Sequence, residues 1–414
     1  MSKHFAIFTI FALSIYTMSI HKFTAPLIYT AEGSFAQNTV IVTDENGTIL
    51  SLDALANHDP SEVNKVEGAI IPGMINTHCH LELSHMKGLV DTGTSLLPFL
   101  KSVVQFRDFA PEIIALAIEQ ADQFMYDQGI VAVGDISNKT DTLQTKQKSK
   151  IRYCTFVEMF DFLHPGMTEG VINQYEAVYE AFAAVLTDKD RVSRVPHAPY
   201  TVSPKLFDHL RQSNPANSII SIHNQETPAE NELFVSGTGA FRDFYSGFGI
   251  DLSSFQANGK TSIHYALEHM DANQTTIFVH NTTTTAEDIK AAHEWGSRVF
   301  WATCANANLY IENRLPHYQI FNDSGQKITI GTDSLTSNWQ LSVWEEIRTI
   351  KRYNSWLPLE ELVKWATTNG AAALGMDDTL GQIKPGKKPG LVVVPVHLTD
   401  KGAQLSEGQV HRLI

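Results

Sequence analysis

Several residues of the chain are of the types that bind metal ions or transfer protons, and most of them follow an apolar stretch. Candidates lie in INTHCHLELSH (75–85), IHNQET (222–227), VHN (279–281) and IGTDS (330–334). The residues concerned are His78, His80, Glu82, His223, Glu226, His280 and Asp333. Imidazoles and carboxylates that converge at about 2.0–2.2 Å hold a divalent metal ion, and such groups also move protons in hydrolysis. The chemistry indicated is the binding of a divalent metal ion.

The spacing in the first segment predicts which side chains share a face. Alternate side chains of an extended strand point the same way, so we expect His78, His80 and Glu82 on one face and Cys79 and Leu81 on the other. A lone HxH pattern is more often a half-exposed edge strand than a metal site. The motif therefore needs partners from other strand ends.

Such partners are expected, because apolar strands with polar ends alternate with amphipathic helices between residues 68 and 376. The predicted strands are 69–80, 129–136, 151–160, 191–200, 218–226, 275–281, 298–308 and 327–334. Ser203-Pro204 and the capping-box pattern 285–288 indicate helix starts. Eight βα units predict an α/β fold of the (β/α)8 TIM-barrel type, in which chemistry gathers at the carboxyl ends of the strands.

Both ends of the chain read as short strands. Asn46-Gly47 is a hairpin signal within residues 18–67, and Leu391–Val396 is a β-branched run within residues 377–414. These two parts are expected to form one small β-sandwich domain beside the barrel.

Four of the candidates are placed at strand ends where a single metal ion could bind. His78, His80, His223 and Asp333 would offer three nitrogens and one oxygen. This set suits one divalent ion, with Zn²⁺ favoured and Fe²⁺ or Mn²⁺ left open. Other histidines, such as His264 and His293, lie in helical context and are expected to be structural.

The composition limits the classes of partner and substrate that the protein is expected to bind. The net charge is −14, and Lys and Arg form no cluster, which argues against nucleic acid and anionic membranes and favours a small-molecule substrate. The three dispersed cysteines form no CxxC pair, as expected of a protein in a reducing, cytoplasmic compartment. Whether the protein forms a homodimer is left open by the sequence.

The first residues are the exception to this pattern. Residues 1–17 have a basic start and the apolar run Phe5–Ile15, as a secretory signal does, but no small-x-small cleavage site follows. We favour a mis-assigned start over a signal or anchor. A chain that begins at Met18 is expected to fold and act like the full chain.

In order, these motifs resemble those of the amidohydrolase superfamily. PGMINTHCHLE is similar to its PGxxNxHxH entry motif, IHNQET to its HxxE on strand five, VHN to the histidine of strand six and IGTDS to the aspartate of strand eight. With NGAAALG and GQIKPGKKPGLVVV near the end, the likeness covers about residues 23–396.

The resemblance also points to a branch of that superfamily. Binuclear members carry a carbamylated lysine at the end of strand four, where this chain has PHAPYTVSP and no lysine. The chain is therefore similar to the mononuclear aminohydrolases, and most of all to aminodeoxyfutalosine deaminase-type proteins of menaquinone biosynthesis. The implied activity is zinc-dependent deamination of an adenine nucleoside, with 6-amino-6-deoxyfutalosine favoured over methylthioadenosine and adenosylhomocysteine.

The resemblance further implies roles for individual residues. Glu226 would protonate a ring nitrogen of the substrate, while His280 and Asp333 would take a proton from the attacking water. Glu82 and His197 would contact the substrate. TCANANLYIENRLP (303–316) departs from the CPxSN segment that often follows strand seven, so that wall of the pocket is expected to differ.

Two alternatives stay open. Hydrolysis of a cyclic amide or a carbon–chlorine bond would use the same metal ligands. A non-catalytic binding protein on the same barrel is the alternative of another class, although Glu226 and Asp333, whose loss would mark it, are both present.

Overall fold

The barrel is built from two parallel sheets of four strands each. A computed structural model describes residues 19–185, 187 and 191–414, so the prediction for residues 1–17 lies outside the described part. One sheet has the order β11-β10-β9-β8 and the other β12-β13-β14-β15. The strands are β8 (Met74–Cys79), β9 (Ile130–Ser137), β10 (Arg152–Met159), β11 (Arg191–Pro196), β12 (Ile219–Asn224), β13 (Thr275–His280), β14 (Val299–Thr303) and β15 (Ile328–Ile330). Every predicted barrel strand thus has a counterpart in the predicted order.

The two sheets meet at the carboxyl ends of their edge strands. Cys79 forms a parallel bridge with Asp333, which joins the ends of β8 and β15. On the other side, the His223 N–H donates to the carbonyl of His197, 2.9 Å away, which joins β12 to the end of β11. Both junctions involve candidate site residues or their neighbours, so closing the barrel also brings these residues together.

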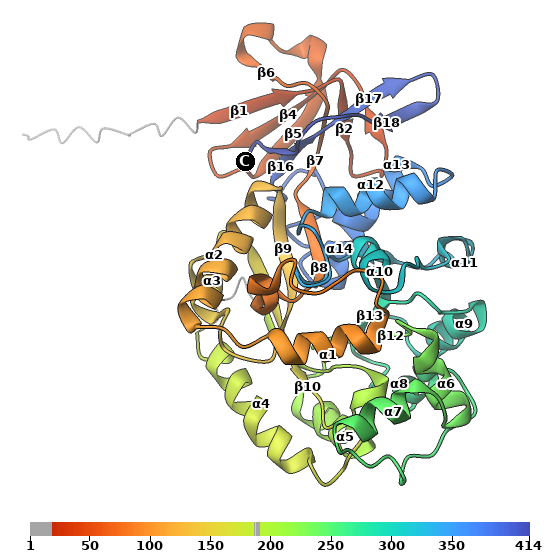
Figure 1. Cartoon of the computed structure of the whole chain (residues 1–414). Coiled ribbons are helices and arrows are strands. Elements are labelled where there is room, and N and C mark those ends of the chain that lie inside the picture. The colour runs from red at the N-terminus through yellow and green to blue at the C-terminus, as the bar shows by residue number, and fades with distance from the viewer. Residues whose placement is uncertain (1–18, 186, 188–190) are drawn as a thin grey trace, which may run out of the picture.

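Helices surround the strands, as Figure 1 shows. They are α1 (Leu96–Phe106), α2 (Pro111–Asp127), α3 (Leu143–Lys148), α4 (Thr168–Ala183), α5 (Pro204–Ser213), α6 (Pro228–Ser236), α7 (Ala240–Gly247), α8 (Ser262–His269), α9 (Ala286–Trp295), α10 (Ala305–Glu312), α11 (Tyr318–Asp323), α12 (Val343–Tyr353), α13 (Leu359–Lys364) and α14 (Gly370–Ala373). The expected helix starts are confirmed: Ser203 caps α5, and Thr285 forms a capping box with Asp288 at α9. No described helix is long and apolar enough to cross a membrane.

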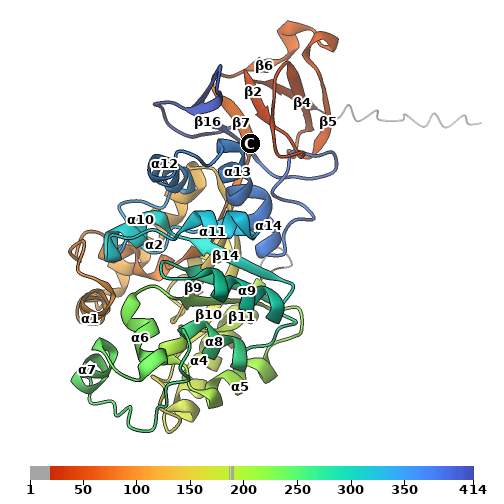
Figure 2. The same ribbon diagram turned by 90° about the vertical axis from the view of Figure 1, so that its right-hand side faces the viewer.

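Strands from both chain ends form the small β region. It contains β1 (Ile20–Thr24), β2 (Leu27–Tyr29), β3 (Phe35–Ala36), β4 (Thr39–Asp44), β5 (Ile49–Ala54), β6 (Asn64–Lys65), β7 (Ala69–Pro72), β16 (Leu391–Val394), β17 (Val396–Thr399), β18 (Gly402–Leu405) and β19 (His411–Arg412). One sheet has the order β5-β4-β1-β6 and another β19-β16-β7-β2-β3. Figures 1 and 2 both show β7 beside β16 at one end of the molecule.

The predicted strand 69–80 is in fact two strands. β7 pairs with β2 and β16 in the small β region, whereas β8 belongs to the barrel. Gly73 separates them, and a Cβ at this position would lie 2.3 Å from a methyl group of Val131 and 2.7 Å from the carbonyl oxygen of Pro389. Only glycine allows the chain to cross between the two regions at such close contact. The domain boundary at residue 68 stays a prediction, and the pairing of β7 favours Gly73 as the crossing point.

The barrel interior is filled by apolar side chains below the site. Ile75, Ala132, Phe156, Ile277 and Phe300 belong to one buried cluster, and each is at most 4% exposed. Each large side chain of this kind contributes about 1.5–3 kcal/mol through burial. This packed layer gives the strand ends a rigid base.

Candidate active site and metal centre

The predicted metal ligands come together at the carboxyl ends of the strands. His78 lies in β8, His80 directly follows it, His223 lies in β12 and Asp333 follows β15. His80 Nε2 is 3.2 Å from His78 Nε2 and 3.1 Å from His223 Nε2. Asp333 Oδ1 is 3.7 Å from His78 Nε2 and 3.5 Å from His80 Nε2. Three segments of the chain thus bring the three histidine nitrogens within 4.8 Å of one another, with Asp333 Oδ1 beside two of them.

These separations fit a single tetrahedral ion. Two ligands that each lie about 2.0–2.1 Å from such an ion lie about 3.3–3.4 Å from one another. The nitrogen–nitrogen distances of 3.1 and 3.2 Å are close to this value. Imidazole nitrogens and a carboxylate oxygen also form an ordinary donor set for zinc, with iron and manganese as weaker matches.

Hydrogen bonds orient two of the imidazoles. His223 Nδ1 lies 2.8 Å from the carbonyl oxygen of His197, so Nδ1 carries the proton and donates it. His280 Nδ1 donates in the same way to Asn308 Oδ1 at 2.8 Å. In both rings Nε2 is left with its lone pair facing the mouth of the barrel. A fixed tautomer of this kind is what metal-binding and proton-accepting histidines require.

Burial keeps these histidines neutral. It lowers the pKa of His80 to about 3 and that of His280 to about 4, and it lowers the pKa of His223 well below its ordinary value, although Asp333 acts in the opposite direction on His80 and His280. For Asp333, burial would raise the pKa, but a hydrogen bond from His78 and the nearby His80 outweigh it, so the pKa falls below its usual range. Neutral imidazoles beside an ionised carboxylate are the forms that bind a cation.

Two site residues occupy the left-handed backbone region. His280 has φ of +74° and Asp333 has φ of +58°, values that side chains other than glycine seldom adopt. Main-chain bonds hold these turns, because the Asp333 N–H donates to the His78 carbonyl and the Asn281 N–H donates to the Asn224 carbonyl, both at 3.0 Å. Strain of this kind is typical of functional sites.

Glu226 faces the same mouth from the turn between β12 and α6. Its Oε1 lies 3.7 Å from His280 Nε2, and the residue is only 6% exposed. Burial raises the pKa of Glu226 well above its ordinary value, and the nearby carboxylates Glu230 and Asp333 add to this effect. The raised pKa favours the protonated carboxyl group, which is the form that can donate a proton.

Around these groups the pocket is lined by both polar and apolar side chains. The polar residues are His80, His223, Glu226, His280, Asp333 and Ser334, and the apolar ones are Leu83, Phe99, Val103 and Ile311. Phe99 and Val103 lie in α1, the first α-helix after β8 in the chain. Apolar walls around a few convergent polar groups are typical of a small-molecule site.

Glu82 does not lie where strand alternation places it. β8 ends at Cys79, and Glu82 belongs to the 3₁₀ helix η3 (Leu81–Met86). Its Oε2 accepts from the N–H groups of Asn138 and Lys139 at 2.9 and 3.1 Å, and Oε1 lies 3.6 Å from an Arg107 nitrogen. The expectation of a shared strand face was wrong because the strand gives way to a helical turn after His80.

The other predicted substrate residue, His197, adjoins the metal centre. Its ring centroid lies 4.8 Å from that of His223, and its Nδ1 is 2.8 Å from the Thr201 hydroxyl. Burial, together with the nearby His78 and His280, lowers the pKa of His197 to about 3. It thus stands as a neutral polar group beside the metal ligands.

Sequence reasoning missed three residues that support the site. Glu158 Oε1 lies 3.3 Å from His223 Nδ1, Asn308 accepts from His280, and the Ser337 hydroxyl donates to Asp333 Oδ2 at 2.6 Å. Asn308 lies in the segment that departs from the CPxSN pattern, so that departure was the available signal. Glu158 lies near the polar end of the predicted strand 151–160, and that position was its signal. Ser337 carried none, because only the fold brings it to Asp333.

The chain belongs to the amidohydrolase family, whose model matches residues 69–410. It is 27% identical over 329 residues to an adenosine deaminase of Helicobacter pylori, a match that covers 78% of each chain. It is 25% identical over 364 residues to an aminodeoxyfutalosine deaminase of Nitratiruptor sp., which covers 84% of this chain and 83% of the relative.

A solved structure supports the same grouping at the level of the fold. The H. pylori aminofutalosine deaminase in complex with methylthio-coformycin matches with a TM-score of 0.76 and 24% identity, over 90% of this chain and 92% of that chain. This structure confirms the expected fold, a barrel with a small domain, and the family match confirms the expected family.

Proposed function

We propose that this chain is a metal-dependent hydrolytic deaminase that releases ammonia from an adenine nucleoside. The observation that carries the proposal is the buried Glu226 carboxyl group, whose pKa is raised, beside three converging histidine nitrogens and Asp333. A site that only bound a metal would have no need of such a proton donor in this position.

The residues divide the proton transfers between them. When bound, the divalent ion would be held by His78, His80, His223 and Asp333 and would lower the pKa of a water molecule to about 7. His280 and Asp333 accept the proton from the attacking water, which their positions at the mouth allow. Glu226 donates its proton to the ring nitrogen and so makes the amine-bearing carbon more electrophilic. The water oxygen bonds to this carbon, and the proton taken from water passes to the amine, so that the carbon–nitrogen bond breaks and ammonia leaves. The remaining hydroxyl proton returns to Glu226 as the ring carbonyl forms.

The substrate proposal combines these residues with the relatives. Two of them are named as deaminases of adenosine and of aminodeoxyfutalosine, both adenine-bearing nucleosides. We propose 6-amino-6-deoxyfutalosine as the first substrate, with methylthioadenosine and adenosylhomocysteine next, and with it a place in menaquinone biosynthesis. Glu82 and His197 would contact the substrate beside the reacting ring.

For the metal we propose one zinc ion per chain. The site offers one complete set of ligands, and β11 is followed by His197 where binuclear relatives carry the bridging lysine. Elemental analysis should give about one equivalent of metal per chain. Two equivalents would overturn the mononuclear assignment.

We also propose that the protein acts in the cytoplasm. Cys79 and Cys304 are buried thiols, and an acidic chain without a basic cluster fits a small soluble substrate. Fractionation of cells that express the untagged full-length chain would test this location.

The function is tested by supplying metal-loaded protein with a panel of compounds. We expect ammonia release, and the ultraviolet change from adenine to hypoxanthine, with adenine nucleosides. Turnover confined to guanine or cytosine would move the protein to another deaminase class. Hydrolysis of lactams or chlorinated rings, without ammonia from any aminated base, would overturn the deaminase proposal.

A further inference from the structure

A buried ion pair lies next to the metal-binding segment. Lys146, in α3, is only 1% exposed and is the one lysine or arginine side chain buried within the described residues. Its Nζ lies 2.6 Å from Asp135 Oδ2 and donates to the hydroxyls of Ser137 and Thr155 at 3.0 and 3.1 Å. The ammonium group also lies 4.9 Å from the centroid of the Phe182 ring. None of these groups has been assigned a part in the reaction.

Asp135 connects this ion pair to the candidate metal site. Its Oδ1 accepts the main-chain N–H of Leu81 at 2.8 Å, and Leu81 stands between His80 and Glu82. The register between β8 and β9 shifts between Asn76 and Cys79, where regular ladder pairing is interrupted. Cys79 still pairs with Asp135 and is the last residue of β8, so the Asp135 carboxylate holds Leu81 beyond the end of the ladder.

The carboxylate of Glu82 makes a matching contact in the opposite direction, from the His80–Glu82 turn to the loop after β9. Glu82 Oε2 accepts the N–H groups of Asn138 and Lys139, which follow β9. Each segment thus supplies one acid that binds the main chain of the other. The turn from His80 to Glu82 and the loop after β9 form a reciprocal clamp, and Lys146 fixes one of its two acids.

We propose that Asp135 is a positioning residue, which sets the geometry of the proposed metal ligand His80 and of Glu82. Asp135 does not line the pocket, so it acts through the Leu81 N–H, while Lys146 balances its buried charge. A buried ion pair adds little net stability compared with apolar residues of similar size, so stability alone gives no reason for this one. The effect on metal affinity is independent of the reaction, whereas the effect on turnover rests on the proposed deaminase function.

The test compares two double variants in the full-length protein. Asp135→Asn with Lys146→Met removes both charges but keeps an oxygen for the Leu81 N–H. Asp135→Val with Lys146→Met removes the charges and also the acceptor, while valine suits a strand. We expect the asparagine pair to bind zinc within about threefold of the wild type. The valine pair should bind zinc about 10–100-fold more weakly, the range found when a supporting contact to a metal ligand is lost.

Three readouts separate positioning from general destabilisation. Zinc affinity is measured by chelator competition, thermal unfolding is measured on the same samples, and the absorption spectrum of the Co²⁺-loaded protein reports ligand geometry. We expect the melting temperature of the valine pair to fall by only a few degrees, because the Leu81 N–H loses its acceptor, while the cobalt spectrum changes. Asp122→Asn is the matched control, because Asp122 accepts from Tyr153 and Ser149 beside Lys146 but does not touch the His80–Glu82 turn.

Equal zinc affinities and cobalt spectra for the two double variants would overturn the proposal. So would an asparagine pair that binds zinc as poorly as the valine pair, because the charge and not the acceptor would then matter. If the valine pair does not fold, Asp135→Leu with Lys146→Met replaces it, and the asparagine pair must still meet its threefold limit. Normal zinc binding without ammonia release by the wild type would contradict the proposed function and leave this inference standing.

Discussion

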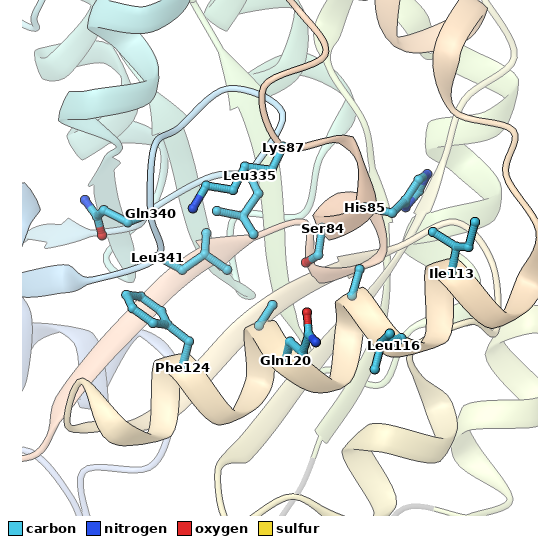
Figure 3. Close-up of a pocket in the computed structure, with 12 residues that line it drawn as sticks. Ser84, His85, Lys87, Ile113, Leu116, Gln120, Phe124, Leu335, Gln340 and Leu341 are labelled. Atoms are coloured by element: carbon cyan, nitrogen blue, oxygen red, sulfur yellow. The ribbon is translucent and has the colours of Figure 1, made fainter.

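The mouth of the barrel and the groove beside α2 are both hollows, but they differ in what their walls can do. Figure 3 shows the groove, with Ile113, Leu116 and Phe124 of α2 on one side and Leu335 and Leu341 on the other. Its volume is about 430 Å³, whereas the pocket at the metal centre measures about 70 Å³. The larger hollow contains no cluster of converging imidazoles and carboxylates among its lining residues. The candidate site is thus marked by convergent polar groups and not by the size of its cavity.

Removing a proposed metal ligand should have the largest effect on metal affinity and on activity. It would show how far the activity of the barrel mouth depends on the bound ion. His223→Ala deletes a ring that lies 3.1 Å from His80 Nε2. We expect metal affinity to fall by more than about 10²-fold, since loss of a supporting contact alone costs 10–100-fold, and ammonia release to stop. Elemental analysis and a turnover assay measure both. His293→Ala, an exposed histidine of α9, should change neither value.

Glu226→Gln should separate chemistry from metal binding. The amide keeps the size of the side chain but cannot donate the proton that the buried acid supplies. We expect kcat to fall by about 10²–10⁴-fold with metal content unchanged. Glu232→Gln, on the exposed face of α6, is the control. Full activity of the Glu226 variant would contradict the role proposed for the acid.

Buried acids behind the mouth should make stability depend on pH. Burial raises the pKa of Glu346 to about 8, against an ordinary value near 4.5, although hydrogen bonds from Asn306 and Asn338 oppose the rise. The unfolded chain releases this proton at lower pH than the folded chain, so the free energy of unfolding should fall as pH rises from about 5 to 8. The contribution is at most about 1.4 kcal/mol per pH unit.

Glu346→Gln tests this dependence, because the amide does not titrate. Urea unfolding at several pH values should show the wild type losing stability relative to the variant as pH rises. A constant difference between the two would contradict the raised pKa. Glu119→Gln, exposed on α2, should give the same pH slope as the wild type.

The smallest effect is expected in the groove. Leu116 is 54% exposed, so Leu116→Ser should change the free energy of unfolding by no more than about 0.5 kcal/mol. We expect kcat/KM for the deaminase substrate to stay within about twofold of the wild type. A large loss of activity would show that the groove takes part in function and would remove the contrast with the mouth.

The sequence predicted the strand ends that carry the candidate site residues well, because parallel strands with apolar interiors leave a strong pattern. His78, His223, His280 and Asp333 could be placed because each follows an apolar run of the right length. The Gly73 crossing could not be predicted, since the contact with Val131 and Pro389 that demands glycine exists only after folding.

Supporting residues were harder to predict than the ligands. Lys146 reads as an ordinary polar residue of a short helix, and nothing local marks it as buried. The predicted position of Glu82 was wrong because the alternating pattern of the sequence continues after Cys79, whereas the strand does not. The Asp135 carboxylate accepts from the Leu81 N–H, and a 3₁₀ helix begins there. Pairwise contacts between distant segments leave no periodic signal in one sequence.

The pairing of β7 with β16 determines when the small β region can fold during synthesis of the chain. Ile71 pairs with Val392, so one edge of the sheet leaves the ribosome more than 300 residues before its partner. At about 5–20 residues per second, β7 waits on the order of 15–60 s for that partner. The barrel can begin to collapse in this interval, but the sheet that joins the chain ends cannot close. The first strands made are therefore among the last to be protected, and their open edge is where a nascent chain would be most exposed to pairing with another copy.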